Sequence, residues 1–339
     1  MAARSHHHDV VAIGASAGGV EALQRLVRDL PADLPAAVFV VLHIGRAETQ
    51  LAEILNRAGP LPAAPATGGE RFEPGRIYVA VPDRHLLLHD GHVLLRRGPH
   101  ENMSRPAIDP LFRSAACSHG PRVVGVVLSG ALNDGTAGLR AIKRCGGIAL
   151  VQHPADAAVP SMPLSALHHV EVDECVPIGA MGEAIARYVM AAAGPKLEIP
   201  PEICLEAAIA AQEMSTEERK VGKLSPFSCP ECGGSLWEVA DGNLLRYRCH
   251  IGHAYTADAM LAAEKERTDQ LLARLLRTHR DRAELVRRMA RQERLRQNAD
   301  LAQALLTRAN EYEENAQVIQ TLLRGRADTA TDGAADSEV

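Results

Sequence analysis

Apolar residues in the first half of the chain occur alternately as short continuous runs and at helical spacing. The run 10–14 is apolar on both faces and rich in β-branched residues, which predicts a buried parallel strand. The segment after it predicts an amphipathic helix, with an apolar face formed by Val20, Leu23, Leu26, Val27 and Leu30. Ser16 therefore lies in a tight turn between a strand and a helix.

The same alternation continues to about residue 193. Further strands are predicted at 37–44, 76–82, 122–130 and 148–152, and further helices at 49–59, 107–120, 134–147 and 177–194. The segment 85–97 predicts a β-hairpin, because Asp90-Gly91 suits its turn. This order predicts an α/β fold, namely a doubly wound, mostly parallel sheet with one antiparallel hairpin.

The pattern changes after residue 193, where a proline-rich stretch, a cysteine-containing stretch and a stretch without glycine or proline follow one another. We therefore predict five segments: an α/β domain at 9–193, a linker with a short helix at 194–225, a zinc-ribbon-like module at 226–255, a long helix or helical hairpin at 256–325, and a disordered acidic tail at 326–339.

Composition narrows the class of protein. The chain has 339 residues, 46% of them hydrophobic, and its formal net charge of −5 argues against nucleic-acid binding by the chain as a whole. No apolar run reaches the roughly 18 residues that cross a bilayer, and the polar start does not resemble a signal peptide. We expect a cytoplasmic protein without membrane insertion, in which the scattered thiols are reduced: Cys117, Cys145, Cys175 and Cys204.

Three reactive side chains follow the ends of predicted strands: Ser16, His43 and Asp134. Because the carboxyl ends of parallel strands meet at one edge of a sheet, we expect these side chains to lie together. Such a set suits acyl transfer, in which histidine takes the serine proton and a carboxylate holds the imidazole. Each residue also has a simpler explanation, as a surface serine, a packed strand-end histidine and a helix cap.

The turn 14–18 fits the G-x-S-x-G pattern of nucleophilic serines. The same glycines could instead bind a dinucleotide phosphate. However, Ser16 stands where that fingerprint has its second glycine, and the next strand ends in His43 rather than in an acidic residue that would hold a ribose.

Five motifs, IGASAGGVEAL, VLHIG, RPAIDPLF, LSGALNDGTAGL and PSMPLSAL, together resemble the catalytic domain of the CheB-type chemotaxis protein-glutamate methylesterases over residues 10–188. Enzymes of that family hydrolyse glutamate methyl esters on chemoreceptor helices and release methanol, and many deamidate glutamine. The resemblance implies that Ser16 is the nucleophile, His43 the base and Asp134 the acid of a triad. It also implies that catalysis needs no cofactor and that methylated chemoreceptors or other signalling-protein helices are partners.

Two loops depart from the family pattern. Ala17 follows the nucleophile where threonine is common, and Ala131 stands where the family has methionine. The resemblance implies that the backbone N–H groups of both alanines bind the oxyanion. Arg105 and Asp109 resemble the family's groove wall, although a capped helix started by proline explains them as well.

Family members of the chemotaxis type carry a receiver domain ahead of the esterase. Because the resemblance starts near residue 9, we expect that control is lost, supplied in trans or exerted by the C-terminal segments.

The cysteine-containing stretch predicts a metal site. Cys229 and Cys232 precede two glycines as in a zinc knuckle, and Cys249 and His253 would complete a tetrahedral site across a hairpin at 235–249. His250 is the rival fourth ligand, but its adjacency to Cys249 would strain joint ligation. Four protein ligands predict a structural zinc, with a redox CxxC as the alternative.

The long helical stretch has apolar residues at helical spacing, among them Leu261, Leu271, Leu272, Leu275, Leu276, Val286 and Met289. Residues 274–296 contain nine arginines, which could bind nucleic acid or an acidic partner. We predict instead that they lie on the solvated flank of a coiled coil, through which the chain forms a homodimer.

Taken together, these features predict a serine hydrolase that removes methyl esters from glutamate side chains of chemoreceptor-like proteins in signalling adaptation. Two alternatives remain: a catalytically weak or inactive signalling adaptor on the esterase fold, and a nucleotide-binding module on the same turn.

Overall fold

The structure is a computed structural model of the chain and describes residues 7–43, 50–214 and 222–332. The chain divides into two compact units between Met260 and Leu261, and each unit is described by itself. Within the described residues, no helix combines the length and the apolarity needed to cross a membrane.

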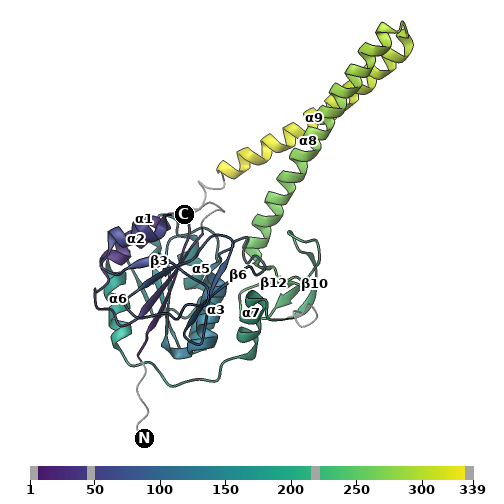
Figure 1. Cartoon of the computed structure of the whole chain (residues 1–339). Helices are drawn as coiled ribbons and strands as arrows, with labels where there is room; N and C mark the ends of the chain where they lie inside the picture. The colour runs from purple at the N-terminus through teal and green to yellow at the C-terminus, as the bar shows by residue number, and fades with distance from the viewer. Residues whose placement is uncertain (1–6, 44–49, 215–221, 333–339) are drawn as a thin grey trace. The chain divides into compact units, whose positions relative to one another are not determined.

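The described part of the first unit is built on a parallel sheet of seven strands in the order β3-β4-β2-β1-β7-β8-β9 (Figure 1). The strands are β1 (Val10–Ala15), β2 (Ala37–Leu42), β3 (Ala63–Pro65), β4 (Ile77–Val79), β7 (Val123–Val127), β8 (Ile148–Gln152) and β9 (Glu174–Val176). The central strands β1, β2 and β7 are buried along their whole length, because their residues are apolar on both faces. The predicted doubly wound α/β fold is confirmed, and the short edge strands β3 and β9 are additions to it.

Helices cover both faces of this sheet. One face packs against α1 (Gly19–Arg28), α2 (Leu51–Ala58) and α6 (Ile178–Met190), and the other against α3 (Ile108–His119), α4 (Thr136–Arg144) and α5 (Ser161–His169). Successive residues of β1 enter opposite cores, since Val10 and Ala12 face α3 whereas Val11 and Ile13 face α1. The predicted hairpin forms from β5 (His85–His89) and β6 (His92–Arg96), with positive φ at Asp90 and Gly91.

The strand order places a topological switch point beside β1. The chain passes from β1 to β2 on one side and later returns to β7 on the other, so the connections diverge above the carboxyl ends of β1 and β7. In open α/β sheets, this topological switch point is where ligands bind. The residues that follow β1, β2 and β7 therefore surround one place.

A smaller antiparallel sheet follows α7 (Pro201–Ala211) in the first unit. It consists of β10 (Lys223–Ser228), β11 (Ser235–Val239), β12 (Arg246–Cys249) and β13 (Ala254–Thr256), in that order. We call residues 222–256 the four-stranded module. Its β11 and β12 form the hairpin predicted at 235–249, whereas residues 215–221 of the predicted linker lie outside the described residues.

The prediction of reduced, scattered thiols is wrong for two cysteines. Cys117 of α3 and Cys204 of α7 form a disulfide with a Cα–Cα distance of 5.4 Å. The two residues are 87 positions apart, and only the packing of α7 on α3 brings them together.

The second unit is an antiparallel helical hairpin, one of the two predicted possibilities. It is formed by α8 (Ala257–Leu295) from Leu261 onward and by α9 (Ala299–Asp332), and Gln297 has a positive φ in the turn. The tail was predicted to be disordered from 326, but α9 continues to Asp332, and residues 333–339 lie outside the described residues.

Alanines form the buried contact of this hairpin. Among the described side chains from Leu261 onward, the most buried recur in steps of seven within each helix: Ala283 and Ala290 on α8, and Ala302, Ala309 and Ala316 on α9. Several residues of the predicted apolar face are instead exposed, including Leu271, Leu275 and Met289. Small side chains at this spacing let two helix backbones approach closely, and the larger apolar residues are then displaced to the flanks.

Candidate active site

The turn after β1 exposes the hydroxyl of Ser16. The Ser16 N–H donates to the carbonyl of Ser129, 2.9 Å away, which ties the turn to the loop after β7. Gly18 has a φ of 72°, and a Cβ there would lie 2.6 Å from Cβ of Ala158 and 2.8 Å from Oγ of Ser129. A small residue with left-handed backbone is therefore needed two positions after Ser16.

The register of the sheet aligns the predicted reactive residues. Gly14 of β1 pairs with Val41 of β2 and with Val127 of β7. Two residues further along these strands are Ser16, His43 and Ser129, and the β7 loop then continues to Asp134. The three predicted residues thus come from neighbouring strands of one sheet edge.

Hydrogen bonds join the three side chains. Nδ1 of His43 lies 3.1 Å from Oγ of Ser16, and Nε2 of His43 lies 2.7 Å from Oδ2 of Asp134. Because a carboxylate only accepts, Nε2 carries the proton, and Nδ1 is left to accept the Ser16 O–H. The residues that we predicted as a triad are brought together in the arrangement of a nucleophile, a base and an orienting acid.

Asp134 is held as a buried carboxylate. It accepts hydrogen bonds from the N–H of Ile108 at 2.6 Å and of Asp109 at 3.2 Å, both at the start of α3, and from Nδ2 of Asn102 at 2.9 Å. Burial raises the pKa of Asp134, but the hydrogen bonds from His43, Ile108 and Asn102 and the charge of His43 outweigh it and lower the pKa to about 2. Asp134 therefore remains ionised at any pH near neutrality.

The groove-wall prediction is wrong for Asp109. Its side chain is 1% exposed and accepts the N–H of Gly135 at 3.0 Å and of Gly138 at 2.6 Å, so it supports the start of α4 from inside. Burial and the adjacent charge of Asp134 raise the pKa of Asp109 to about 7. Arg105 donates to Asp83 and to the carbonyl of Gly98.

The two alanines predicted to bind the oxyanion are both exposed beside Ser16. Within the described part of the chain, the backbone N–H groups of Ala17 and Ala131 make no hydrogen bond. A Cβ on Gly130 would lie 2.8 Å from Cβ of Ser16, so the absence of a side chain there lets the loop approach the nucleophile. Both N–H groups are therefore available to a substrate oxygen.

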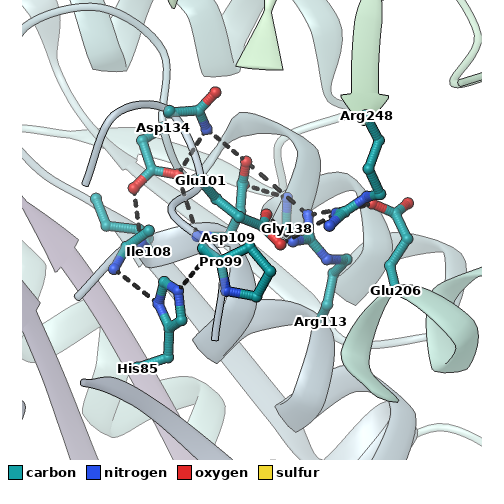
Figure 2. Close-up of polar contacts among 12 residues, drawn as sticks. His85, Pro99, Glu101, Ile108, Asp109, Arg113, Asp134, Gly138, Glu206 and Arg248 are labelled. Carbon is teal, nitrogen blue, oxygen red and sulfur yellow. Dashed lines mark hydrogen bonds and ion pairs between the residues drawn. The ribbon is translucent and has the colours of Figure 1, made fainter. Parts of the chain in front are cut away.

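Several polar residues around the site were not predicted from the sequence. His85 is fully buried, accepts the N–H of Ala107 at Nδ1 and donates from Nε2 to the carbonyl of Pro99. Glu101 forms ion pairs with Arg113 and Arg248, which Figure 2 draws together with Asp134 and Asp109. Arg113 did carry a signal, since it is a charged residue among the apolar positions of a predicted helix, and such a residue needs a buried partner.

The predicted metal ligands also come together. The ligand atoms of Cys229, Cys232, Cys249 and His253 all lie within 4.8 Å of one another. Sγ of Cys232 lies 3.7 Å from Sγ of Cys249, and Nδ1 of His253 lies 3.6 Å from Sγ of Cys229 and 3.5 Å from Sγ of Cys249. Tetrahedral zinc would separate two sulfurs by about 3.8 Å and sulfur from nitrogen by about 3.6 Å. This group contains His253 rather than His250.

Comparison with known proteins relates the first half of the chain to one family. The model of the family described as CheB methylesterase matches residues 11–185. The chain is 40% identical over 184 residues to protein-glutamate methylesterase/protein-glutamine glutaminase 2 of Anaeromyxobacter dehalogenans, and the match covers 54% of each chain. It is 38% identical over 179 residues to protein-glutamate methylesterase/protein-glutamine glutaminase of Photorhabdus laumondii, and that match covers 51% of each chain.

A solved structure supports the same relation. The Thermotoga maritima CheB methylesterase catalytic domain is 30% identical to this chain, with a TM-score of 0.51, over 53% of this chain and 97% of that one. The chain spans about half the length of the curated relatives named above. The family match ends before α7 and the four-stranded module.

Proposed function

Since the chain belongs to the CheB methylesterase family, we propose that it is a serine hydrolase acting on methyl esters of glutamate side chains in chemoreceptor-like proteins. Glutamine deamidation at the same site belongs to this proposal, because both relatives named above are called methylesterase and glutaminase. The observation that carries the proposal is the hydrogen-bonded series from Ser16 through His43 to Asp134.

The proposed reaction proceeds through an acyl-enzyme. Oγ of Ser16 attacks the ester carbonyl while Nδ1 of His43 takes its proton, and the carbonyl oxygen is held by the N–H groups of Ala17 and Ala131. His43 then protonates the leaving methoxide, and methanol departs. Water attacks the acyl-enzyme by the same route and regenerates the hydroxyl of Ser16. Throughout, Asp134 holds the imidazole and stabilises its charged form.

Methanol release from methylated chemoreceptor helices tests this proposal. Ser16→Ala should abolish release without unfolding the domain. Ser118→Ala is the matched control, because Ser118 lies at the far end of α3 and its hydroxyl accepts the N–H of Asp90. Release that is equal in wild type and Ser16→Ala would overturn the assignment of Ser16 as nucleophile.

The adaptor alternative receives no support from the relatives, which are named as enzymes. It predicts that a fluorophosphonate probe does not label Ser16, whereas a working triad forms the oxygen–phosphorus bond, expels fluoride and passes the proton to His43. A cytoplasmic location and action without a catalytic cofactor are further parts of our proposal.

We also propose that the four-stranded module holds a structural zinc. The tetrahedral spacing of Cys229, Cys232, Cys249 and His253 supports it, as does Glu231, which lies 3.1 Å from Nε2 of His253 and can fix that ring. Wild-type protein should contain one zinc per chain by elemental analysis. Cys232→Ala should lose it, and Cys175→Ala, which changes a half-buried cysteine outside the group, should retain it.

The homodimer remains a proposal for the second unit. Its support is the exposed apolar row on α8, which includes Leu271, Leu275, Leu285 and Met289. Sedimentation equilibrium of the full chain tests it, since a purely monomeric protein at micromolar concentration would contradict self-association through this helix.

A further inference from the structure

The side chain of Asn102 links the four-stranded module to Asp134 of the proposed triad. This residue lies in the loop between β6 and α3, is 6% exposed and has a φ of 48°. Its Nδ2 donates both to Oδ1 of Asp134 at 2.9 Å and to Oδ2 of Asp109 at 3.0 Å. Asn102 therefore bridges the two buried carboxyl groups beneath the triad.

The orientation of the Asn102 amide is set from the opposite side. Its Oδ1 accepts the backbone N–H of Thr256, at the end of β13, at 3.0 Å. Both amide hydrogens and the amide oxygen thus have partners. A flipped amide would place its oxygen against two carboxyl groups and its hydrogens against an N–H, so the module determines which way the amide points.

The backbone of Asn102 is bound to the module as well. Its N–H donates to the carbonyl of Ala254 at 2.8 Å, and the N–H of Ala254 donates to the carbonyl of His100 at 3.2 Å. Strand β13 therefore pairs with the loop that carries Asn102. The residue before Ala254 is His253, one of the proposed zinc ligands.

A second contact holds the neighbour of Asp134. Oγ1 of Thr256 donates to Oδ1 of Asn133 at 2.5 Å, and Nδ2 of Asn133 donates to Asp258 at 2.9 Å. Asn133 is 3% exposed and directly precedes Asp134 in the loop after β7. Thr256 thus binds Asn102 through its backbone N–H and Asn133 through its hydroxyl. Asn102 donates to the Asp134 carboxylate, and Asn133 precedes Asp134 in the chain.

Buried ion pairs fix the module against this region. Arg248 of β12 donates to Glu101 at 3.0 Å and to Glu206 of α7 at 2.6 Å, and Glu101 also pairs with Arg113 of α3 (Figure 2). All four side chains are at most 5% exposed. Since Glu101 precedes Asn102, displacement of the module would leave buried charges unpaired and release the loop.

We infer that Asn102 is a positioning residue for Asp134, and that the four-stranded module, which lies outside the family match, keeps it in place. The inference rests on the proposed role of Asp134 in the triad. It makes the module a structural part of the catalytic centre, and a zinc bound at His253 would stabilise the strand that holds Asn102.

Labelling of Ser16 by a fluorophosphonate tests this inference in the full-length protein without the natural substrate. We compare Asn102→Gly with Met103→Gly. Met103 is the next residue, also has a positive φ, and is 36% exposed, so its change frees the same loop without removing the amide. Asn102→Gly should lower the labelling rate roughly 10- to 100-fold, whereas Met103→Gly should stay within about twofold of wild type.

The pH profile separates positioning from loss of folded protein. Asn102 is among the donors that hold the pKa of Asp134 below its ordinary value, so loss of this donor should raise that pKa and move the acid limb of labelling to higher pH. A smaller folded fraction would lower the rate at every pH without moving the limb. Unchanged rate and limb in Asn102→Gly would overturn the inference.

The module side is tested by Thr256→Val, with Thr268→Val as the control because the Thr268 hydroxyl bonds within α8. Thr256→Val should slow labelling in the same direction as Asn102→Gly, and a rate equal to that of Thr268→Val would overturn the role of the module. Removal of zinc should slow labelling while far-UV circular dichroism shows that the helices persist. If wild type is labelled but releases no methanol, the proposed substrate fails and the positioning inference stands.

Discussion

Glu206 of α7 offers a sharp test of how the four-stranded module is attached. Its carboxylate accepts hydrogen bonds from Arg246 and from Arg248 of β12 and lies 3.8 Å from Arg113 of α3. Glu206→Gln keeps the shape of the side chain but removes a charge that faces three buried guanidinium groups.

The loss of unfolding free energy in Glu206→Gln depends on the partners that the arginines keep. Breaking a buried ion pair from one side costs about 3–5 kcal/mol. Arg246 keeps Asp241 at 2.8 Å and Arg248 keeps Glu101 at 3.0 Å, so we expect the lower end, about 3 kcal/mol. Burial raises the pKa of Glu206, but Arg246, Arg113 and Arg248 outweigh it and hold the pKa well below its usual value. The ionised Glu206 therefore makes its full contribution to the free energy of unfolding above the usual carboxyl pKa, and this contribution is lost only in stronger acid.

The assay uses the single tryptophan, Trp237, which lies in β11 and therefore reports on the module itself. For a urea dependence of about 1–3 kcal/mol per molar, the fluorescence midpoint of Glu206→Gln should fall by roughly 1–3 M. Glu202→Gln is the matched control, because Glu202 lies one turn earlier and pairs with Arg144 at the surface. An exposed pair contributes about 0–1 kcal/mol. Equal midpoint shifts in the two variants would refute the reasoning.

Three further predictions concern the nucleophile, acid stability and the helical hairpin. Gly130→Ala should lower the Ser16 labelling rate at least roughly tenfold, because its Cβ would lie 2.8 Å from that of Ser16 and 2.0 Å from Sδ of Met162; an unchanged rate would contradict the close approach. Burial, aided by Arg122, lowers the pKa of His119 to about 4, so the folded state resists protonation of this ring. Stability is therefore complete above the usual histidine pKa and falls as the pH drops towards 4. Wild type should lose roughly 3 kcal/mol of unfolding free energy over that range, and His119→Gln should lack this part of the loss in urea titrations at each pH. Ala309→Leu should destabilise the α8–α9 hairpin by about 1–3 kcal/mol through overpacking, seen as a lower thermal midpoint at 222 nm, since Ala309 is fully buried; a raised midpoint would show that the contact has room.

The grouping of Ser16, His43 and Asp134 could be predicted because it depends on local patterns and one topological rule. Apolar runs mark where the strands end, and parallel strands end at the same edge of a sheet, so the residues that follow them lie together. The grouping of the candidate metal ligands could be predicted for a similar reason, since the cysteines occur at ligand spacing on either side of a hairpin.

The sequence by itself determined the elements, their order and the residues that follow each strand, because these depend on periodicity along the chain. Only the tertiary structure decided the through-space partners: Asp109 turned inward to α4, Cys117 joined to Cys204, alanines rather than leucines between α8 and α9, and Asn102 held by Thr256. Such partners are far apart in sequence. Their side chains pair only when two packed elements remove water between them, and no pattern within a single segment records which elements will meet.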